Sequence, residues 1–107
     1  MKNLSQMLKQ AGELQTRMQA MQEQLALLEV TGVASGGKVE VTMTGKGEVK
    51  RVKIDPELLA AQTADLLEDL VRVAVNDARA KAETEARARM AEITGGLPLP
   101  PGFQLPF

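Results

Sequence analysis

The hydrophobic residues of the first thirty positions recur at alternating steps of three and four. The seam that they form consists of Leu4, Met7, Ala11, Leu14, Met18, Met21, Leu25 and Leu28. Such steps repeat every seven residues, the period of a helix that packs along a second long helix. The pattern predicts a helix over residues 3–29 that pairs with another helix, in this chain or in a second copy. The alternative is an ordinary amphipathic helix packed on its own domain.

An alternating pattern of β-branched residues follows the predicted helix. Val39, Val41 and Met43 fall on one face of a strand, and Val52 and Ile54 on one face of another. Glycine-containing turns at residues 35–37 and 45–47 separate these strands from each other and from a first strand near "LEVTGVA". Residues 29–54 are therefore expected to form a three-stranded antiparallel meander, whose apolar face needs a helix to cover it.

Two helix starts follow the sheet. Asp55 can cap a short helix over 56–60 that begins with Pro56, and Thr63 can cap a long helix over 64–93 that ends before Gly95 and Gly96. We predict a single α+β domain over 1–96, followed by an extended Pro-rich tail over 97–107. The stripe that the last helix should bury contains Leu67, Leu70, Val71, Ala74, Ala78, Ala82, Met90 and Ile93, with Ala86 among its small residues.

The lengths of the two long helices favour an elongated assembly. At 1.5 Å per residue they measure ~40 and ~45 Å, whereas a compact domain of this size has a radius of gyration near ~13 Å. Both helices must therefore project beyond the sheet, and their seams need a partner. An elongated homodimer is the simplest arrangement.

The side chains that most often carry out catalysis are missing. The chain has no His, Cys, Trp or Tyr, and its serines are Ser5 and Ser35. Residues 32–38 match the phosphate-loop pattern G-x-x-x-x-G-K, but Val39 stands where Ser or Thr would hold Mg²⁺, and a strand follows instead of a helix. We expect no enzyme activity, metal, cofactor or small-molecule substrate. The N-terminus lacks a signal peptide's apolar core, no apolar run approaches a membrane span, and cysteine is absent, so we expect a soluble cytoplasmic protein without a membrane partner.

Positive charge is local, because the formal net charge is −1. Five Lys or Arg lie between residues 38 and 53, and four between residues 79 and 89. On the last helix, spacings of i, i+4 predict ion pairs that would leave an ordinary solvated face: Glu68–Arg72, Asp77–Lys81, Glu83–Arg87 and Glu85–Arg89. No aromatic residue lies among the basic ones, so any nucleic acid should be bound through phosphates, with weak sequence preference and steep salt dependence.

Four motifs in register resemble the YbaB/EbfC family of bacterial nucleoid-associated proteins. They are "LEVTG", "V-x-IDP-x-LL", "EDLVRVAVNDA" and the closing "LPPGF", and the resemblance extends over nearly the whole chain. It implies a tweezer-like homodimer located at the nucleoid, with long helices projecting from a central sheet and binding double-stranded DNA with little sequence specificity. It also implies roles in organising or protecting the chromosome, in regulation or in repair.

The resemblance supplies no sharp motif for DNA contact, so the candidates are basic residues on the helices. They are Lys2, Lys9, Arg17, Arg79, Arg87 and Arg89, with Lys46, Lys50, Arg51 and Lys53 of the hairpin as a competing set. The alternative function is a dimeric adaptor that docks other helices on its Leu- and Met-rich helix and has no nucleic-acid ligand.

The tail "GGLPLPPGFQLPF" holds both aromatic residues of the chain, Phe103 and Phe107. Because the late part of the last helix is lined by alanine, it should offer a shallow apolar surface. We expect the tail to dock there as a structural strap, in the same subunit or in its partner.

Overall fold

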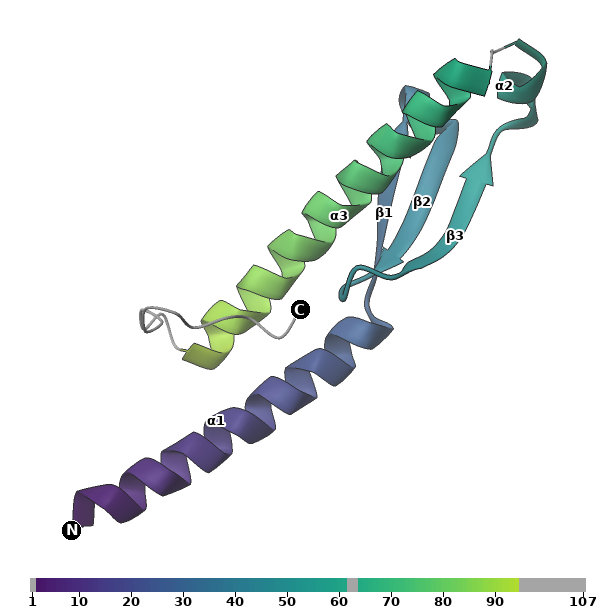
Figure 1. Cartoon of the computed structure of the whole chain (residues 1–107). Coiled ribbons are helices and arrows are strands. Elements are labelled where there is room, and N and C mark those ends of the chain that lie inside the picture. Colours follow the sequence, from purple (N-terminus) through teal and green to yellow (C-terminus); the bar gives the residue numbers. More distant parts are fainter. Residues whose placement is uncertain (1, 62–63, 95–107) are drawn as a thin grey trace.

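The computed structural model describes residues 2–61 and 64–94. The chain forms, in order, α1 (Lys2–Leu27), β1 (Glu29–Ala34), a 3-10 turn η1 (Ser35–Gly37), β2 (Val39–Thr44), β3 (Val49–Ile54), α2 (Pro56–Ala61) and α3 (Ala64–Thr94) (Figure 1). The predicted α+β arrangement of two long helices, a three-stranded antiparallel sheet and a short helix is confirmed. The first helix ends at Leu27, two residues earlier than predicted, because Glu29 already belongs to β1. The expected tail over 97–107 and the expected cap Thr63 lie outside the described residues.

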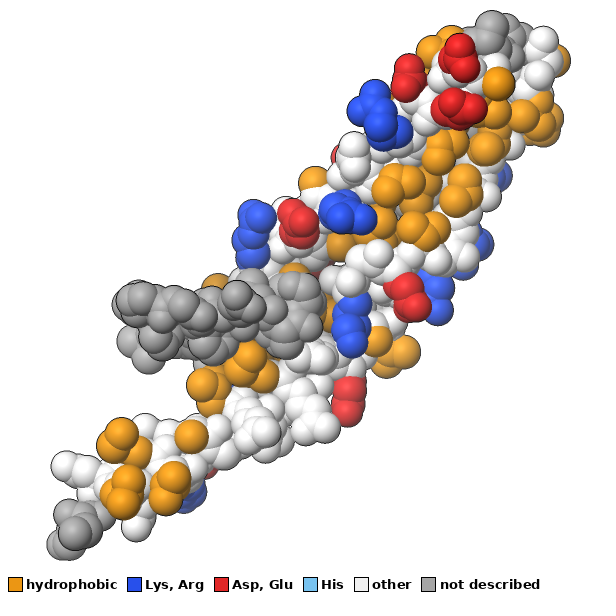
Figure 2. All heavy atoms as spheres, viewed as in Figure 1, with side chains coloured by type: hydrophobic (Ala, Val, Ile, Leu, Met, Phe, Trp, Pro, Cys, Tyr) orange, Lys and Arg blue, Asp and Glu red, His pale blue; other side chains and the backbone are white. Residues whose placement is uncertain are grey.

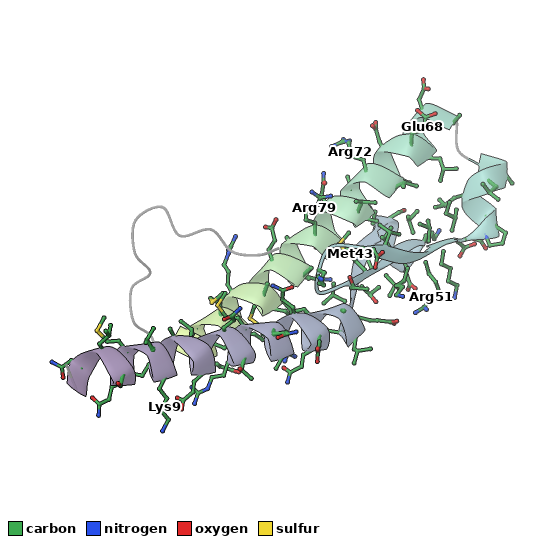
Figure 3. The ribbon with its side chains drawn as sticks, turned by 60° about the horizontal axis from the view of Figure 1, so that its bottom comes forward. Lys9, Met43, Arg51, Glu68, Arg72 and Arg79 are labelled. Carbon is green, nitrogen blue, oxygen red and sulfur yellow. The ribbon has the colours of Figure 1, made fainter. Side chains whose placement is uncertain are left out.

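The sheet has the order β1-β2-β3, with β2 in the centre. In the register, Val41 lies opposite Gly32 on one side and Val52 on the other, so these residues share the face that holds the core. Val41 and Met43 are fully buried on this face, between the sheet and α3 (Figure 3). At the end of β3, Asp55 caps α2, because its Oδ1 accepts a hydrogen bond of 2.9 Å from the Glu57 N–H.

Helix α3 lies directly on β1 because Gly32 has no side chain. A Cβ atom at this position would overlap the backbone of Ala74 and Ala78. The residues of α3 that face inward recur every four positions, in a row of four alanines and one methionine that is buried along its whole length: Ala74, Ala78, Ala82, Ala86 and Met90. A row of i, i+4 residues runs obliquely around a helix, so α3 contacts the sheet near its start and α1 near its end.

The end of helix α1 and the residue that follows it are joined to the hairpin between β2 and β3 through backbone carbonyl groups. The Gly45 N–H donates hydrogen bonds to the carbonyls of Leu25 (2.9 Å) and Leu28 (3.1 Å), groups that have no acceptor role inside the helix. Met21 and Leu25 then pack with Ala86 and Met90 of α3 in a second hydrophobic cluster beyond the sheet. Ala82 and Ala86 belong to the alanine surface on which the tail is expected to dock, and they also line a hollow beside the β2–β3 turn, so the docking of the tail stays a prediction.

The first half of α1 extends past the end of α3 (Figure 1). Leu4 and Met7 are 56% and 63% exposed there, whereas Met21 and Leu25 of the same seam are buried. The described chain measures 71 × 25 × 17 Å, with a radius of gyration of 19.2 Å, well above the ~13 Å of a compact domain of this size. The molecule is elongated, as the helix lengths predicted.

The outer edge of β1 is covered by side chains of α3. The Val33 N–H donates to Oδ2 of Asp77 (2.9 Å), and Nζ of Lys81 donates to the carbonyl of Thr31 (2.8 Å). Asp77 and Lys81 also form an ion pair of 3.2 Å. The pKa of the Asp77 carboxyl is held below its ordinary value, mainly by the Val33 N–H and then by Lys81. These contacts occupy backbone groups that could otherwise pair with another strand.

We predict that Gly32→Ala destabilises the fold by at least about 2 kcal/mol, because the new Cβ meets backbone atoms of α3 and forces the helix away from the sheet. Urea denaturation measures the change. Gly12→Ala is the matched control: nothing lies within 4 Å of a Cβ there, so the exposed helix should gain about 0.5–1 kcal/mol. Equal stability of Gly32→Ala and wild type would contradict the close approach.

We also predict that Asp77→Asn destabilises the protein in a pH-dependent way. A carboxyl whose pKa is lowered by folding contributes stability above its unfolded pKa of ~3.9 and loses that contribution as the pH falls through the folded pKa. The difference in unfolding free energy between wild type and variant should therefore be present at pH 7 and shrink below about pH 4. Urea denaturation between pH 7 and pH 3 measures it, and a constant difference would contradict the role of the charge.

Candidate nucleic-acid interface

Five of the basic side chains are already paired with carboxylates. All five pairs have exposed side chains and distances between 3.1 and 3.7 Å: Lys38–Glu57, Arg51–Glu29, Arg72–Asp69, Lys81–Asp77 and Arg87–Glu83. Exposed pairs of this kind contribute little to stability, about 0–1 kcal/mol. Because a carboxylate lies close to each of these cations, its positive charge is partly neutralised, and it is a weaker candidate for binding an anion.

The ion pairs predicted along the last helix are only half correct. Asp77–Lys81 and Glu83–Arg87 form as the i, i+4 spacing predicts. Arg72 pairs with Asp69, three residues before it, instead of the predicted Glu68, four residues before it. Arg89 does not pair with Glu85, because α1 lies beside it and its Nη1 donates to Oε1 of Gln24 (2.9 Å). Only the contact between the two helices could reveal this partner.

Seven basic side chains form no ion pair with any part of the chain that the structure describes. They are Lys9, Arg17, Lys46, Lys50, Lys53, Arg79 and Arg89. Four of the seven lie on α1 or on α3 from Arg79 onward. These two helical segments, α1 and residues 79–94 of α3, are called the arm below.

Two hollows of the surface each bring together two of these cations from distant parts of the sequence. Arg17 of α1 and Arg89 of α3 line one hollow of about 230 Å³ beside the contact between the helices. Arg79 of α3 and Lys46 of the β2–β3 turn line another of about 220 Å³. The second hollow thus contains one residue of the helical set and one of the competing hairpin set. No local signal in the sequence indicates that these two residues lie close together.

The other helical candidates are placed separately. Lys9 lies on the face of α1 that also carries Arg17, and Figure 3 shows it pointing away from the sheet. Arg87 is exposed and paired with Glu83 at 3.6 Å. Lys2 begins α1, and its side chain lies outside the described residues.

Two of the hairpin candidates, Arg51 and Lys53, lie on a different surface from the arm. Arg51 and Lys53 belong to the face of β3 opposite the core, and Arg51 is bound to Glu29 of β1 at 3.1 Å. In Figure 3, Arg51 and Arg79 point away from each other, one from the sheet and the other from α3. Figure 2 likewise shows basic and acidic side chains interspersed along the molecule, without one large basic patch on the visible face.

The described residues contain no group of three or more acidic, His or Cys side chains placed to hold a metal ion. Among those same residues, no helix is both long enough and apolar enough to cross a bilayer. Residues 2–61 and 64–94 hold no aromatic side chain, so bases have nothing aromatic to stack on in this part of the chain.

The elongated α+β chain is similar to proteins of other organisms. Residues 1–97 match the YbaB/EbfC DNA-binding family. Over its full 107 residues the chain is 50% identical to a nucleoid-associated protein of Rhodospirillum rubrum, all of whose length is covered. The crystal structure of an uncharacterized protein from Helicobacter pylori shares the fold, with a TM-score of 0.75 at 22% identity, over 85% of this chain and 96% of that one.

The chain therefore belongs to the YbaB/EbfC DNA-binding family, as its motifs indicated.

Proposed function

We propose that this chain is a homodimeric nucleoid-associated protein that binds duplex DNA mainly through phosphate contacts, with low sequence specificity. In this role it organises or protects the chromosome and assists its regulation or repair. Membership of a DNA-binding family and the 50% identity to a nucleoid-associated protein support the class of function. Neither the family nor the relative bears on the mode of binding, for which the positions of the charged side chains are the support.

The placement of the unpaired cations carries this proposal. Lys9, Arg17, Arg79 and Arg89 lie on the arm and form no ion pair with the described residues, although the whole chain has a formal net charge of −1. Cations spaced along a helix and free of neighbouring aromatic side chains suit the repeating phosphates of a duplex and provide no means to read bases. Low sequence specificity follows from the same feature.

The uncovered half of the sheet supports a homodimer. Helix α3 lies over β1 and β2, so Val49 and Val52 of β3 are 47% and 49% exposed although they face the same side as the core. Figure 2 shows hydrophobic side chains gathered over the end of the molecule that holds α2, β3 and the start of α3. Beside the core row, α3 carries Val73, which is 45% exposed, and the half-buried Leu70. A second copy related by a two-fold axis can lay its α3 on this β3 and receive the same cover in return.

The exposed seam of α1 favours a second candidate function. Leu4, Met7 and Leu8 are more than half exposed along the part of α1 that extends past α3. Such a surface fits the apolar face of another helix, so the protein could instead be a dimeric adaptor without a nucleic-acid ligand. The two candidates differ in whether the protein binds DNA at low salt.

We predict that the wild-type protein binds unrelated duplexes of equal length with similar affinity, and that log K falls linearly with log[salt]. Each neutralised phosphate contributes about 0.9 to the slope. Four arm cations in each of two chains therefore limit the slope to about 7. Fluorescence anisotropy across a salt series measures both quantities. An absence of binding at low salt would favour the adaptor, and a flat salt response would contradict phosphate contacts.

We predict further that light scattering gives twice the chain mass of 11.5 kDa for the wild type, and that Val52→Glu lowers it toward the monomer mass. The charge would be buried under the α3 of the second copy, which is costly. Val33→Glu is the matched control, since Val33 is 39% exposed in β1 on the other face of the sheet and should leave the mass unchanged. A monomeric wild type would contradict the dimer, and a dimeric Val52→Glu would place its interface elsewhere.

A further inference from the structure

The contact between α1 and α3 beyond the sheet holds a small hydrophobic cluster with two arginines on its flank. Met21 and Leu25 pack with Ala86 and Met90, so the two helices are fixed relative to each other at this point. The hollow beside them is lined by side chains from both helices: Arg17, Ala20, Met21 and Gln24 of α1, and Arg89, Glu92 and Ile93 of α3.

The guanidinium of Arg89 is held in place without being neutralised. Its Nη1 donates to Oε1 of Gln24 at 2.9 Å, and an amide carries no charge. Its Nε is buried and has no acceptor among the described residues. A buried N–H without an acceptor is rare in folded proteins, and this one belongs to a cation that also forms no ion pair in that part of the chain. Because no carboxylate is bound to it, the guanidinium keeps its full positive charge, and an anion would have to reach it through its Nη groups rather than through the buried Nε.

The second arginine comes from the other helix and is also unpaired. Arg17 is exposed and lines the hollow together with Arg89, while Glu92 is the one carboxylate in the lining. Neither arginine forms an ion pair with Glu92. Two cations and one anion leave the hollow with a net positive charge, in a space of about 230 Å³ that can take a phosphate group. The planar fork of donors on each guanidinium matches the oxygens of such a group.

We infer that Arg17 and Arg89, with Arg89 oriented by Gln24, form a clamp for one backbone phosphate of duplex DNA at the contact between α1 and α3. This site rests on the proposed function, because it takes its ligand from the DNA that the arm binds. It goes beyond that function in singling out one pair of arm cations. A phosphate in this position bridges α1 and α3, so DNA binding also secures the two helices of the arm to each other.

The test compares charge-removing variants of the same chemical type. Arg17→Gln and Arg89→Gln should each weaken duplex binding roughly tenfold and lower the salt slope by about 1.8 for a dimer, at 0.9 per phosphate and per chain. Arg87→Gln is the matched control on the same helix, because Arg87 is already paired with Glu83. It should change affinity less than about threefold.

Arg89→Lys separates charge from geometry at the same position. It keeps the positive charge but not the planar fork, so it should preserve most of the salt slope while weakening binding severalfold. Thermal unfolding followed by circular dichroism checks that each variant folds. Because Arg17 is exposed, Arg17→Gln removes no buried atom and should fold like the wild type. If the phosphate bridges the two helices, DNA should raise the melting temperature of Arg17→Gln less than that of Arg87→Gln.

The outcomes distinguish the clamp from the function on which it rests. If wild-type protein binds DNA and Arg17→Gln and Arg89→Gln behave like Arg87→Gln, the clamp is overturned while DNA binding stands. If Arg17→Gln alone weakens binding, Arg17 contacts DNA without Arg89, and the clamp is again overturned. If wild-type protein does not bind duplex DNA at low salt, the proposed function fails and the clamp fails with it.

Discussion

The close approach of α3 to β1 at Gly32 is the constraint on which the rest of the structure depends. With no side chain on β1 at this point, the helix backbone rests almost directly on the strand, and Ala74 and Ala78 are the small residues that allow it. The same proximity brings Asp77 and Lys81 to the backbone edge of β1. One glycine and two alanines thus decide both where the helix lies and how the strand edge is protected.

Two open surfaces follow from that placement. A helix seated on β1 and β2 cannot also cover β3, which leaves Val49 and Val52 half exposed. The i, i+4 row of small residues then carries the contact obliquely around α3, so its last turns meet α1 instead of the sheet. The position of α3 on β1 and β2 therefore leaves one apolar surface suited to a second copy. It also places the last turns of α3 beside α1, which forms the arm that bears the unpaired cations.

The charges of the arm make the proposed binding of phosphate compatible with a formal net charge of −1. Carboxylates on α3 neutralise Arg72, Lys81 and Arg87. Arg79 and Arg89 escape pairing because they lie beside other elements, the β2–β3 turn in one case and α1 in the other. Positive charge is therefore kept where two elements meet, and phosphate binding there would depend on the fold as well as on composition.

Most of the fold could be predicted from the sequence, because its signals are local. The heptad seam, the alternation of Val39, Val41 and Met43, and the cap at Asp55 each act within a few residues. The end of α1 was placed two residues too late, since helix and strand compete at Leu28 and Glu29 and neither has a strong breaker. Sequence spacing identified the alanine row of α3, but it did not tell that Met21 and Leu25 of α1 would pack against its end at Ala86.

The candidate site was predictable only as a set of residue types. The sequence determined that two long helices would carry cations and that residues 2–61 and 64–94 would contain no aromatic side chain beside them. It also determined that some of these cations would pair with carboxylates at i, i+4. Which cations stay unpaired was decided by tertiary structure: Arg89 meets Gln24, 65 residues away, and shares a hollow with Arg17. Local periodicity fixes which face of a helix a side chain occupies, but only packing fixes what stands opposite that face.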